Sequence, residues 1–281
     1  MTRPRRSFVP TLGSAGSYVA LLLLVLAALG PTLWVVVSSF KTQSQILAPH
    51  GSVLPDPPTL HGYSDVFVQV HLDRYLLNSF IYALGGTLGA MVTGLLAAYP
   101  TARLQFPFRN AFTIAFSLAL AVPIIGLIVP EFFIMRDLGL LDTRIGLVIF
   151  YAAMFFPLSF VIQRAFLTSL PYEIEEAAVM DGAGYFTILG RIIVPLARPG
   201  LVTVGVLVFI FIWNEFFFAQ LLTISLDNFN IQLALAQFVS TFERNDTGAL
   251  AGATLAMTVP IAAFLFLQRY VVAGLTSGSS R

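Results

Sequence analysis

The sequence predicts an all-α integral membrane protein with six transmembrane helices and both termini in the cytoplasm. Three observations support this prediction: the composition, the lengths of the charge-free segments, and the positions of arginine and lysine. Of the 281 residues, 57% are hydrophobic and 10% are charged, whereas soluble domains contain about 25% charged residues. The mean hydropathy of +0.86 therefore indicates that lipid surrounds most of the chain.

Six segments are long and apolar enough to cross a bilayer, which takes about 20 residues of helix. They are residues 18–37, 75–102, 110–130, 145–163, 199–226 and 247–268. None alternates with a period of two, so strands are not indicated, and helices satisfy their own backbone groups in lipid. Glu215 interrupts the fifth segment, and Pro123 and Pro157 are expected to bend the third and fourth.

The second segment is rich in glycine, and Gly85 and Gly89 form a G-x-x-x-G pattern within it. Small residues at this spacing let two helix backbones approach closely in a membrane. We interpret the pattern as a packing surface for another helix of the same chain.

Orientation follows from the arginines and lysines of short loops, which are enriched on the cytoplasmic side. With the N-terminus inside, ten such residues face the cytoplasm: Arg3, Arg5, Arg6, Arg103, Arg109, Arg164, Arg191, Arg198, Arg269 and Arg281. Five face the outside: Lys41, Arg74, Arg136, Arg144 and Arg244. The bias predicts a multi-pass protein of the cell membrane with cytoplasmic termini.

The predicted spans divide the chain into an arm, a transmembrane domain and a tail. Residues 1–17 are a basic cytoplasmic arm, residues 18–270 form the transmembrane domain, and residues 271–281 are a cytoplasmic tail. Within the domain, residues 41–73 form a proline-containing extracytoplasmic segment, and residues 164–198 form a long cytoplasmic loop. Both are too short to fold as separate domains.

The composition argues against several kinds of chemistry. All three histidines, His50, His61 and His71, lie in the extracytoplasmic segment, and their spacings match no metal-ligand pattern. The chain contains no cysteine, and its net charge of +1 gives no reason to expect nucleic-acid binding. We expect no catalytic residues, no metal and no cofactor bound by this chain.

The predicted cytoplasmic loop contains a cluster of charged residues, which is unusual in so hydrophobic a chain. Ser169 before Pro171 predicts the start of a short helix. Acidic residues follow in its first turns, where the positive end of the helix favours them: Glu173, Glu175 and Glu176. Gly182 and Gly184 then predict its end. A helix lying on lipid headgroups would be basic, so this acidic helix predicts a protein partner.

The same loop resembles the EAA loop of ABC importer permeases. Glu176-Ala177-Ala178 is followed after three residues by Gly182, and Ile192-Ile193-Val194-Pro195 occupies the place of the I-x-L-P sequence that ends the family pattern. The resemblance implies a type I ABC importer transmembrane domain, in which this loop forms the coupling helix that docks in a cleft of the ATPase subunit. By that resemblance the ATPase-coupling residues are Glu176, Ala177, Ala178, Asp181, Gly182 and Ala183.

Other stretches are similar to the maltose-type carbohydrate importers, and they extend the resemblance over almost the whole chain. They are "PPTLHGYSDVF" from Pro57, "NSF" from Asn78, "AAYPTARLQFPFR" from Ala97 and "FLQRYVVAGLTSG" from Phe266. This similarity implies a sugar or sugar derivative as the transported solute. The tail departs from the family by ending in Ser279-Ser280-Arg281.

Energy has to come from another subunit, because the single lysine, Lys41, has no phosphate-binding G-x-x-x-x-G-K sequence around it. ATP and magnesium are therefore expected on a partner ATPase. The resemblance implies two copies of that ATPase, a second permease subunit in a heterodimer, and an extracytoplasmic solute-binding protein. In such an assembly, ATP-driven closure of the ATPase moves the coupling helix and alternates access across the membrane.

The fifth segment carries a second candidate site at Trp213, Asn214 and Glu215. An ionised side chain inside a bilayer normally faces a protein interior or a water-filled path. An aromatic face beside hydrogen-bonding groups suits a sugar ring, so one interpretation is a substrate path. The other is a structural hydrogen bond from Glu215 to a neighbouring helix.

Three other functions are alternatives to an ABC importer permease for sugars. The first is an ABC permease for a solute that is not a sugar. The second is a secondary transporter working without ATP, although the spans lack the series of charges that ion coupling uses. The third is an intramembrane enzyme, which the absence of histidine from every predicted span argues against.

Overall fold

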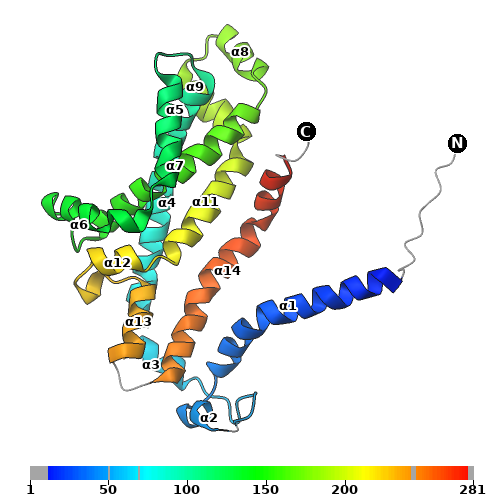
Figure 1. The fold of residues 1–281 in the computed structure, drawn as a ribbon, viewed down its shortest axis with the longest axis vertical. Helices are drawn as coiled ribbons and strands as arrows, with labels where there is room; N and C mark the ends of the chain where they lie inside the picture. The colour runs from blue at the N-terminus through cyan, green and yellow to red at the C-terminus, as the bar shows by residue number, and fades with distance from the viewer. Residues whose placement is uncertain (1–11, 50, 69, 242–244, 278–281) are drawn as a thin grey trace.

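The computed structural model describes residues 12–49, 51–68, 70–241 and 245–277. Across these residues it contains helices and no strands, so the predicted all-α architecture is confirmed (Figure 1). The α-helices are α1 (Leu12–Ser38), α2 (Gln43–Leu47), α3 (His61–Val68), α4 (Leu72–Arg103), α5 (Arg109–Leu118), α6 (Ile128–Asp137), α7 (Arg144–Ser169), α8 (Glu173–Met180), α9 (Tyr185–Ile188), α10 (Val194–Leu196), α11 (Arg198–Trp213), α12 (Phe217–Leu222), α13 (Ile231–Thr241) and α14 (Asp246–Ser277).

Four of the six spans are single helices, and two are broken. Stretches of α1, α4, α7 and α14 are each long and apolar enough to cross a membrane. The other two spans are helix pairs, 109–121 with 124–137 and 185–196 with 198–213, bent by 95° and 77°. Counting each bent pair as one span gives up to six, the number predicted, although residues 185–196 of the second pair lie in the segment predicted as a cytoplasmic loop.

The third span differs from the predicted continuous segment 110–130. It breaks at Val122 and Pro123, where helix gives way to extended backbone with ψ of 123° and 110°. The proline ring disfavours helical backbone at the residue before it, so the chain turns here and continues into α6. Pro157, by contrast, lies inside α7, which stays one helix.

The fifth span also ends earlier than predicted. Helix α11 stops at Trp213, and the chain continues through the short α12 into α13. The sequence predicted a span that continues to residue 226. The first turn of α13 carries buried apolar side chains, Ile231, Leu233 and Ala234, so the apolar pattern that favours a helix was present there.

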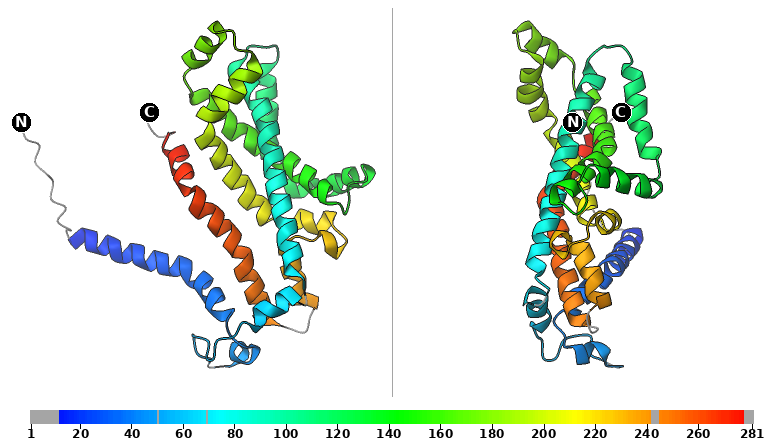
Figure 2. Two further views of the ribbon diagram at one scale, coloured as in Figure 1. Left: turned by 180° about the vertical axis from the view of Figure 1, so that it is seen from behind. Right: turned by 90° about the vertical axis from the view of Figure 1, so that its left-hand side faces the viewer.

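The centre of the molecule is the contact between α4 and α7, which lie side by side along much of their length (Figures 1 and 2). A Cβ added to Gly85 would lie 3.0 Å from Val148, and one added to Gly89 would lie 2.6 Å from the Cβ of Ala152. Glycine is therefore required for the close approach. The predicted intrachain role of the G-x-x-x-G pattern is confirmed.

Helix α1 diverges from the rest of the molecule and leaves its apolar side chains uncovered (Figure 2). It contacts α14, but residues 16–30 are exposed along the whole stretch. An apolar surface of this size calls for lipid or another protein as its neighbour.

The two ends of the molecule carry different elements, as expected for a protein with two membrane faces. Helices α8 and α9 lie at one end, beside the connection from α4 to α5, whereas α2 and α3 lie at the other (Figure 1). The N-terminal arm extends into described structure, since α1 begins at Leu12. Residues 1–11 and the last four residues of the tail, 278–281, lie outside the described residues, and α14 continues through the first part of the tail.

Candidate coupling loop and substrate path

The acidic helix of the predicted cytoplasmic loop is α8, and it begins later than Ser169 predicted. Ser169 is the last residue of α7, and its hydroxyl donates to the carbonyl of Phe166 at 2.7 Å. Leu170 is extended (ψ 144°) because Pro171 follows it, so α8 starts at Glu173. Its first turn contains the three predicted glutamates, which the positive helix end stabilises.

The end of α8 is fixed by Gly182, as the sequence predicted. Gly182 has a φ of +81°, a conformation that residues with a Cβ rarely adopt. Its N–H donates to the carbonyl of Val179 at 2.9 Å, and the N–H of Ala183 donates to that of Ala178 at 3.0 Å. These two bonds form a Schellman motif, which turns the chain sharply toward α9.

The six predicted coupling residues gather on α8 and the turn after it, but they do not share one face. Glu176, Ala177, Asp181 and Gly182 are exposed, Ala183 is half-buried, and Ala178 is buried. Ala177 and Ala178 therefore do not form one flat surface, because successive helical residues point about 100° apart. Within the part of the chain that the structure describes, the outward face of α8 is exposed.

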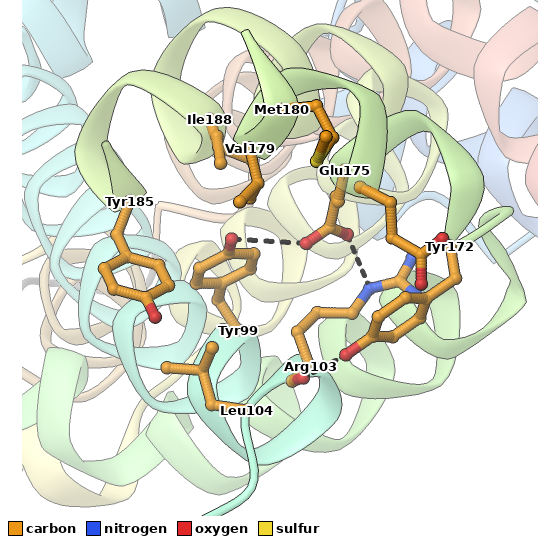
Figure 3. Close-up of a pocket in the computed structure, with 10 residues that line it drawn as sticks. Tyr99, Arg103, Leu104, Tyr172, Glu175, Val179, Met180, Tyr185 and Ile188 are labelled. Carbon is orange, nitrogen blue, oxygen red and sulfur yellow. Dashed lines mark hydrogen bonds and ion pairs between the residues drawn. The ribbon is translucent and has the colours of Figure 1, made fainter. Parts of the chain in front are cut away.

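The inward face of α8 holds a buried ion pair that the sequence analysis missed (Figure 3). Glu175 Oε1 lies 2.8 Å from Nε of Arg103, the last residue of α4, and both side chains are less than 10% exposed. The hydroxyl of Tyr99 donates to Glu175 Oε2 at 3.2 Å. No pattern in the sequence links Arg103 to a residue 72 positions away.

A cavity of about 380 Å³ lies beside this pair, between α8, α9 and the end of α4 (Figure 3). Its lining includes Arg103 and Glu175, the exposed Glu176, and apolar side chains such as Met180 and Ile188. The cavity therefore lies between part of α8 and the end of α4.

Of the predicted substrate-path residues, Trp213 packs inside the protein. Its side chain is 1% exposed, and its indole N–H donates to the carbonyl of Ala256 in α14 at 3.0 Å. The ring also stacks on Phe209, with 5.9 Å between centroids. The indole therefore joins α11 to α14.

Glu215 is placed at the break between α11 and α12 and not in the middle of a helix. Its carboxylate accepts hydrogen bonds from the N–H groups of Phe218 and Ala219 at 2.9 and 3.0 Å. The hydroxyl of Tyr151 in α7 donates to it at 2.7 Å. Three donors and the positive end of α12 satisfy the charge, which favours the structural interpretation left open above.

Asn214 is the one member of the predicted path that is exposed in this chain. Its amide nitrogen donates to the carbonyl of Ile210 at 2.8 Å. The three residues thus point to different surroundings, and contact of Trp213, Asn214 and Glu215 with substrate stays a prediction.

The opposite end of the molecule is organised around the loop that joins α12 to α13. Asn78, which is fully buried in α4, donates to the carbonyls of Asp227 and Phe229 at 2.8 and 2.9 Å. One turn on, the Tyr82 hydroxyl donates to the carbonyl of Asn228 at 2.8 Å. The Ser79 hydroxyl accepts from the N–H of residue 231 at 2.7 Å. The outer end of α4 therefore holds this loop, residues 223–230, hereafter the outer loop.

Asp142, in the connection from α6 to α7, holds the other side of the outer loop. Its carboxylate accepts from the N–H groups of Ile224 and Ser225, each at 3.0 Å, and from the side chains of Ser225 and Asn228. Burial raises the pKa of Asp142, but these hydrogen bonds outweigh burial and lower the pKa from 3.8 to about 2.

Because this carboxylate has a lowered pKa, the stability it supplies should be lost in acid. The contribution is complete above the pKa of about 3.9 in the unfolded chain and falls as the pH drops toward about 2. We expect the difference in thermal midpoint between wild type and Asp142→Asn to be constant at neutral pH and to shrink below about pH 4. A difference that stays constant through that range would contradict the role of the charge.

Comparison with known proteins places this architecture in a family. Residues 90–277 match the family described as "Binding-protein-dependent transport system inner membrane component". The trehalose transport system permease protein SugB of Mycobacterium tuberculosis is 38% identical, over 90% of this chain and 92% of its own. The diacetylchitobiose uptake system permease protein NgcG of Streptomyces coelicolor is 32% identical, over 95% and 89%.

A solved structure shares the fold. A chain of a bacterial ABC transporter involved in the import of the acidic polysaccharide alginate aligns with a TM-score of 0.84 and 24% identity. The alignment covers 95% of this chain and 99% of that one. The predicted type I ABC importer fold and membrane location agree with these matches. The chain belongs to the family of binding-protein-dependent transport system inner membrane components.

Proposed function

We propose that this chain is the permease subunit of an ATP-driven importer that carries a sugar or sugar derivative across the cell membrane. The observation that carries the proposal is α8, a short acidic helix with an EAA sequence that projects from the end of the molecule with its outward face uncovered (Figure 1). A helix of this kind needs a docking partner outside the chain.

The proposed partners follow from the family and from the lack of a phosphate-binding G-x-x-x-x-G-K sequence in this chain. We propose two copies of an ABC ATPase, which bind ATP and magnesium, a second permease subunit in a heterodimer, and a solute-binding protein outside the membrane. The family description itself names dependence on a binding protein. The uncovered helix α1 offers an apolar surface on which another subunit or lipid has to lie.

The substrate class rests on the relatives. One is named for trehalose and the other for diacetylchitobiose, both of which are oligosaccharides. We therefore propose a carbohydrate as the cargo. The alternative of a non-sugar solute within the same family would be favoured if no carbohydrate stimulated ATP hydrolysis by the assembled transporter, and transport without any ATPase would favour a secondary transporter.

In the proposed mechanism, the residues of this chain convert motion of the ATPase into motion of the helices. Glu176, Ala177, Asp181 and Gly182 lie where a partner can reach them, and Gly182 fixes the turn into α9. When the ATPase subunits close on ATP, α8 moves with them. The bent helices that follow α8 carry this displacement to α11, and access to the transport path alternates between the two membrane faces.

The test is capture of the ATPase by the complete chain, extracted from the membrane in detergent. We expect Glu176→Lys to lower the amount of co-purifying ATPase about tenfold or more, because reversing a charge at a docking contact costs several kcal/mol. Glu173→Lys is the matched control, since Glu173 is also exposed in the first turn of α8 but lies outside the EAA sequence.

The assembled wild-type complex should hydrolyse ATP faster when the solute-binding protein and a suitable disaccharide, with trehalose tested first, are added. A chain that purifies without an ATPase and transports sugar into liposomes without ATP would refute the proposal.

A further inference from the structure

We propose that Arg103 and Glu175 are a positioning pair that fixes α8 to the end of α4, so that any displacement of α8 is passed directly into α4. The proposal rests on the proposed function only in naming α8 as the docking helix. The position of α8 itself can be measured without an ATPase.

The pair joins two elements that are far apart in the sequence. Arg103 is the last residue of α4, and Glu175 lies in the first turn of α8. Their side chains are 4% and 9% exposed, and Nε and Oε1 are 2.8 Å apart. The hydroxyl of Tyr99, one turn earlier in α4, donates to the other carboxylate oxygen at 3.2 Å. Both oxygens of Glu175 are thus held by α4.

Arg103 also contacts the short segment that leads into α8. Its Nη2 donates to the carbonyl of Leu170 at 3.0 Å. Its guanidinium carbon lies 5.0 Å from the centre of the Tyr172 ring, and the Tyr172 hydroxyl donates to the backbone carbonyl of Arg103. One arginine therefore contacts the chain on both sides of Pro171 as well as the helix itself (Figure 3).

Besides the ion pair, the inward face of α8 is held by Ala178, which belongs to a buried hydrophobic cluster with Tyr99 and Ile188. Only two of its residues are buried, Glu175 and Ala178. The cavity of about 380 Å³ lies where apolar side chains would otherwise pack between α8 and α4. Since Pro171 precedes the helix and Gly182 follows it, the helix is bounded by a stiff extended segment and a tight turn, and the ion pair sets its angle between them.

A buried ion pair is suited to this task, because it fixes geometry more than it adds stability. Replacing such a pair with apolar residues is often neutral, whereas removing one partner leaves a buried charge. The guanidinium is held on two sides, at Nε by Glu175 Oε1 and at Nη2 by the carbonyl of Leu170, and this restricts its orientation. The pair therefore holds α8 at a defined angle beside a cavity that would otherwise let the helix tilt.

The first experiment measures the position of α8 with two spin labels. The chain has no cysteine, so Met180→Cys on α8 and Leu88→Cys on α4 provide two exposed sites without further changes. The labelled complete chain is placed in lipid nanodiscs, and the distance distribution between labels is measured. We expect one narrow distribution in the parent, loss of the narrow distribution in Arg103→Ala, and its return in the charge-exchanged variant Arg103→Glu with Glu175→Arg.

Tyr99→Phe is the matched control, because it removes one hydrogen bond from Glu175 and leaves the ion pair in place. A narrow distribution in Arg103→Ala, at the parent distance, would overturn the proposal. The proposal would also be overturned if Arg103→Ala gives a broad distribution and neither the charge-exchanged variant nor Arg103→Lys shows the narrow one. In that case the substitutions would act through general folding.

The second experiment measures ATPase capture by the same variants in the co-expressed assembly. Arg103→Glu and Glu175→Arg should each lower capture about tenfold, as expected for a contact on which an interface depends, and the exchange should restore most of it. If the wild type captures no ATPase while the spin labels still report a fixed α8, the proposed function fails and the positioning pair stands. If capture is normal in wild type and in Arg103→Glu, the pair has no part in docking.

Discussion

Replacing Gly89 with leucine should prevent α4 and α7 from packing and should leave almost no monodisperse protein. A Cβ at this position would lie 2.6 Å from the Cβ of Ala152, and a Cβ cannot move without its backbone. Overpacking by a few methylenes already costs about 1–3 kcal/mol, and four added carbon atoms at a helix contact should exceed that range. Size-exclusion chromatography of the detergent-extracted chain and its thermal midpoint provide the measurement.

Gly30→Leu is the control, since nothing lies within 4 Å of the corresponding Cβ in α1. It adds the same side chain to a transmembrane helix and should leave the thermal midpoint almost unchanged. Gly89→Leu with a wild-type midpoint would show that the α4–α7 contact is looser than described here.

The second large effect is expected at Glu215, where the substitution to alanine should destabilise the chain by about 3 kcal/mol or more. Hydrogen bonds to a charged group contribute about 1.5–3 kcal/mol each, and this carboxylate accepts three. Its loss also leaves the hydroxyl of Tyr151 buried without its partner. Transport should fall in step with the amount of folded protein.

Tyr151→Phe removes one of these three bonds and keeps the carboxylate, so it should cost less than Glu215→Ala. Thermal unfolding of the purified chain orders the variants, and transport in proteoliposomes, scaled to folded protein, gives the functional effect. If Glu215→Ala unfolds at the wild-type temperature but raises the KM for sugar, Glu215 contacts substrate, and the structural assignment made here is wrong.

The sequence predicted the helices that cross the membrane without interruption, because charge-free length is a local property. The limits expected for α4 and α7 are close to those observed. The bend at Pro123 could not be predicted in the same way. Pro157 lies in an equally apolar segment and leaves its helix continuous, so the outcome depends on packing around each proline and not on the residue alone.

The candidate site was predictable only where it depends on neighbours in the sequence. The glutamates of the first turn of α8 and the glycine that ends it follow from helix capping rules. The partners of Glu215 and Glu175 do not, because Tyr151 and Arg103 are 64 and 72 positions away. The cost of an ionised side chain in a bilayer predicted that the Glu215 carboxylate would have hydrogen-bond partners. Only the structure shows which residues these are.

Helix α4 is anchored by buried polar side chains at both of its ends, and this has a mechanical consequence. Its 32 residues form one continuous helix about 48 Å long, at about 1.5 Å per residue. Arg103 attaches one end to α8, the proposed docking helix, and Asn78 and Tyr82 attach the other end to the outer loop. A helix is stiff along its axis, and α4 stays one helix through Pro100, so we expect a displacement applied at the Arg103 end to reach the outer loop.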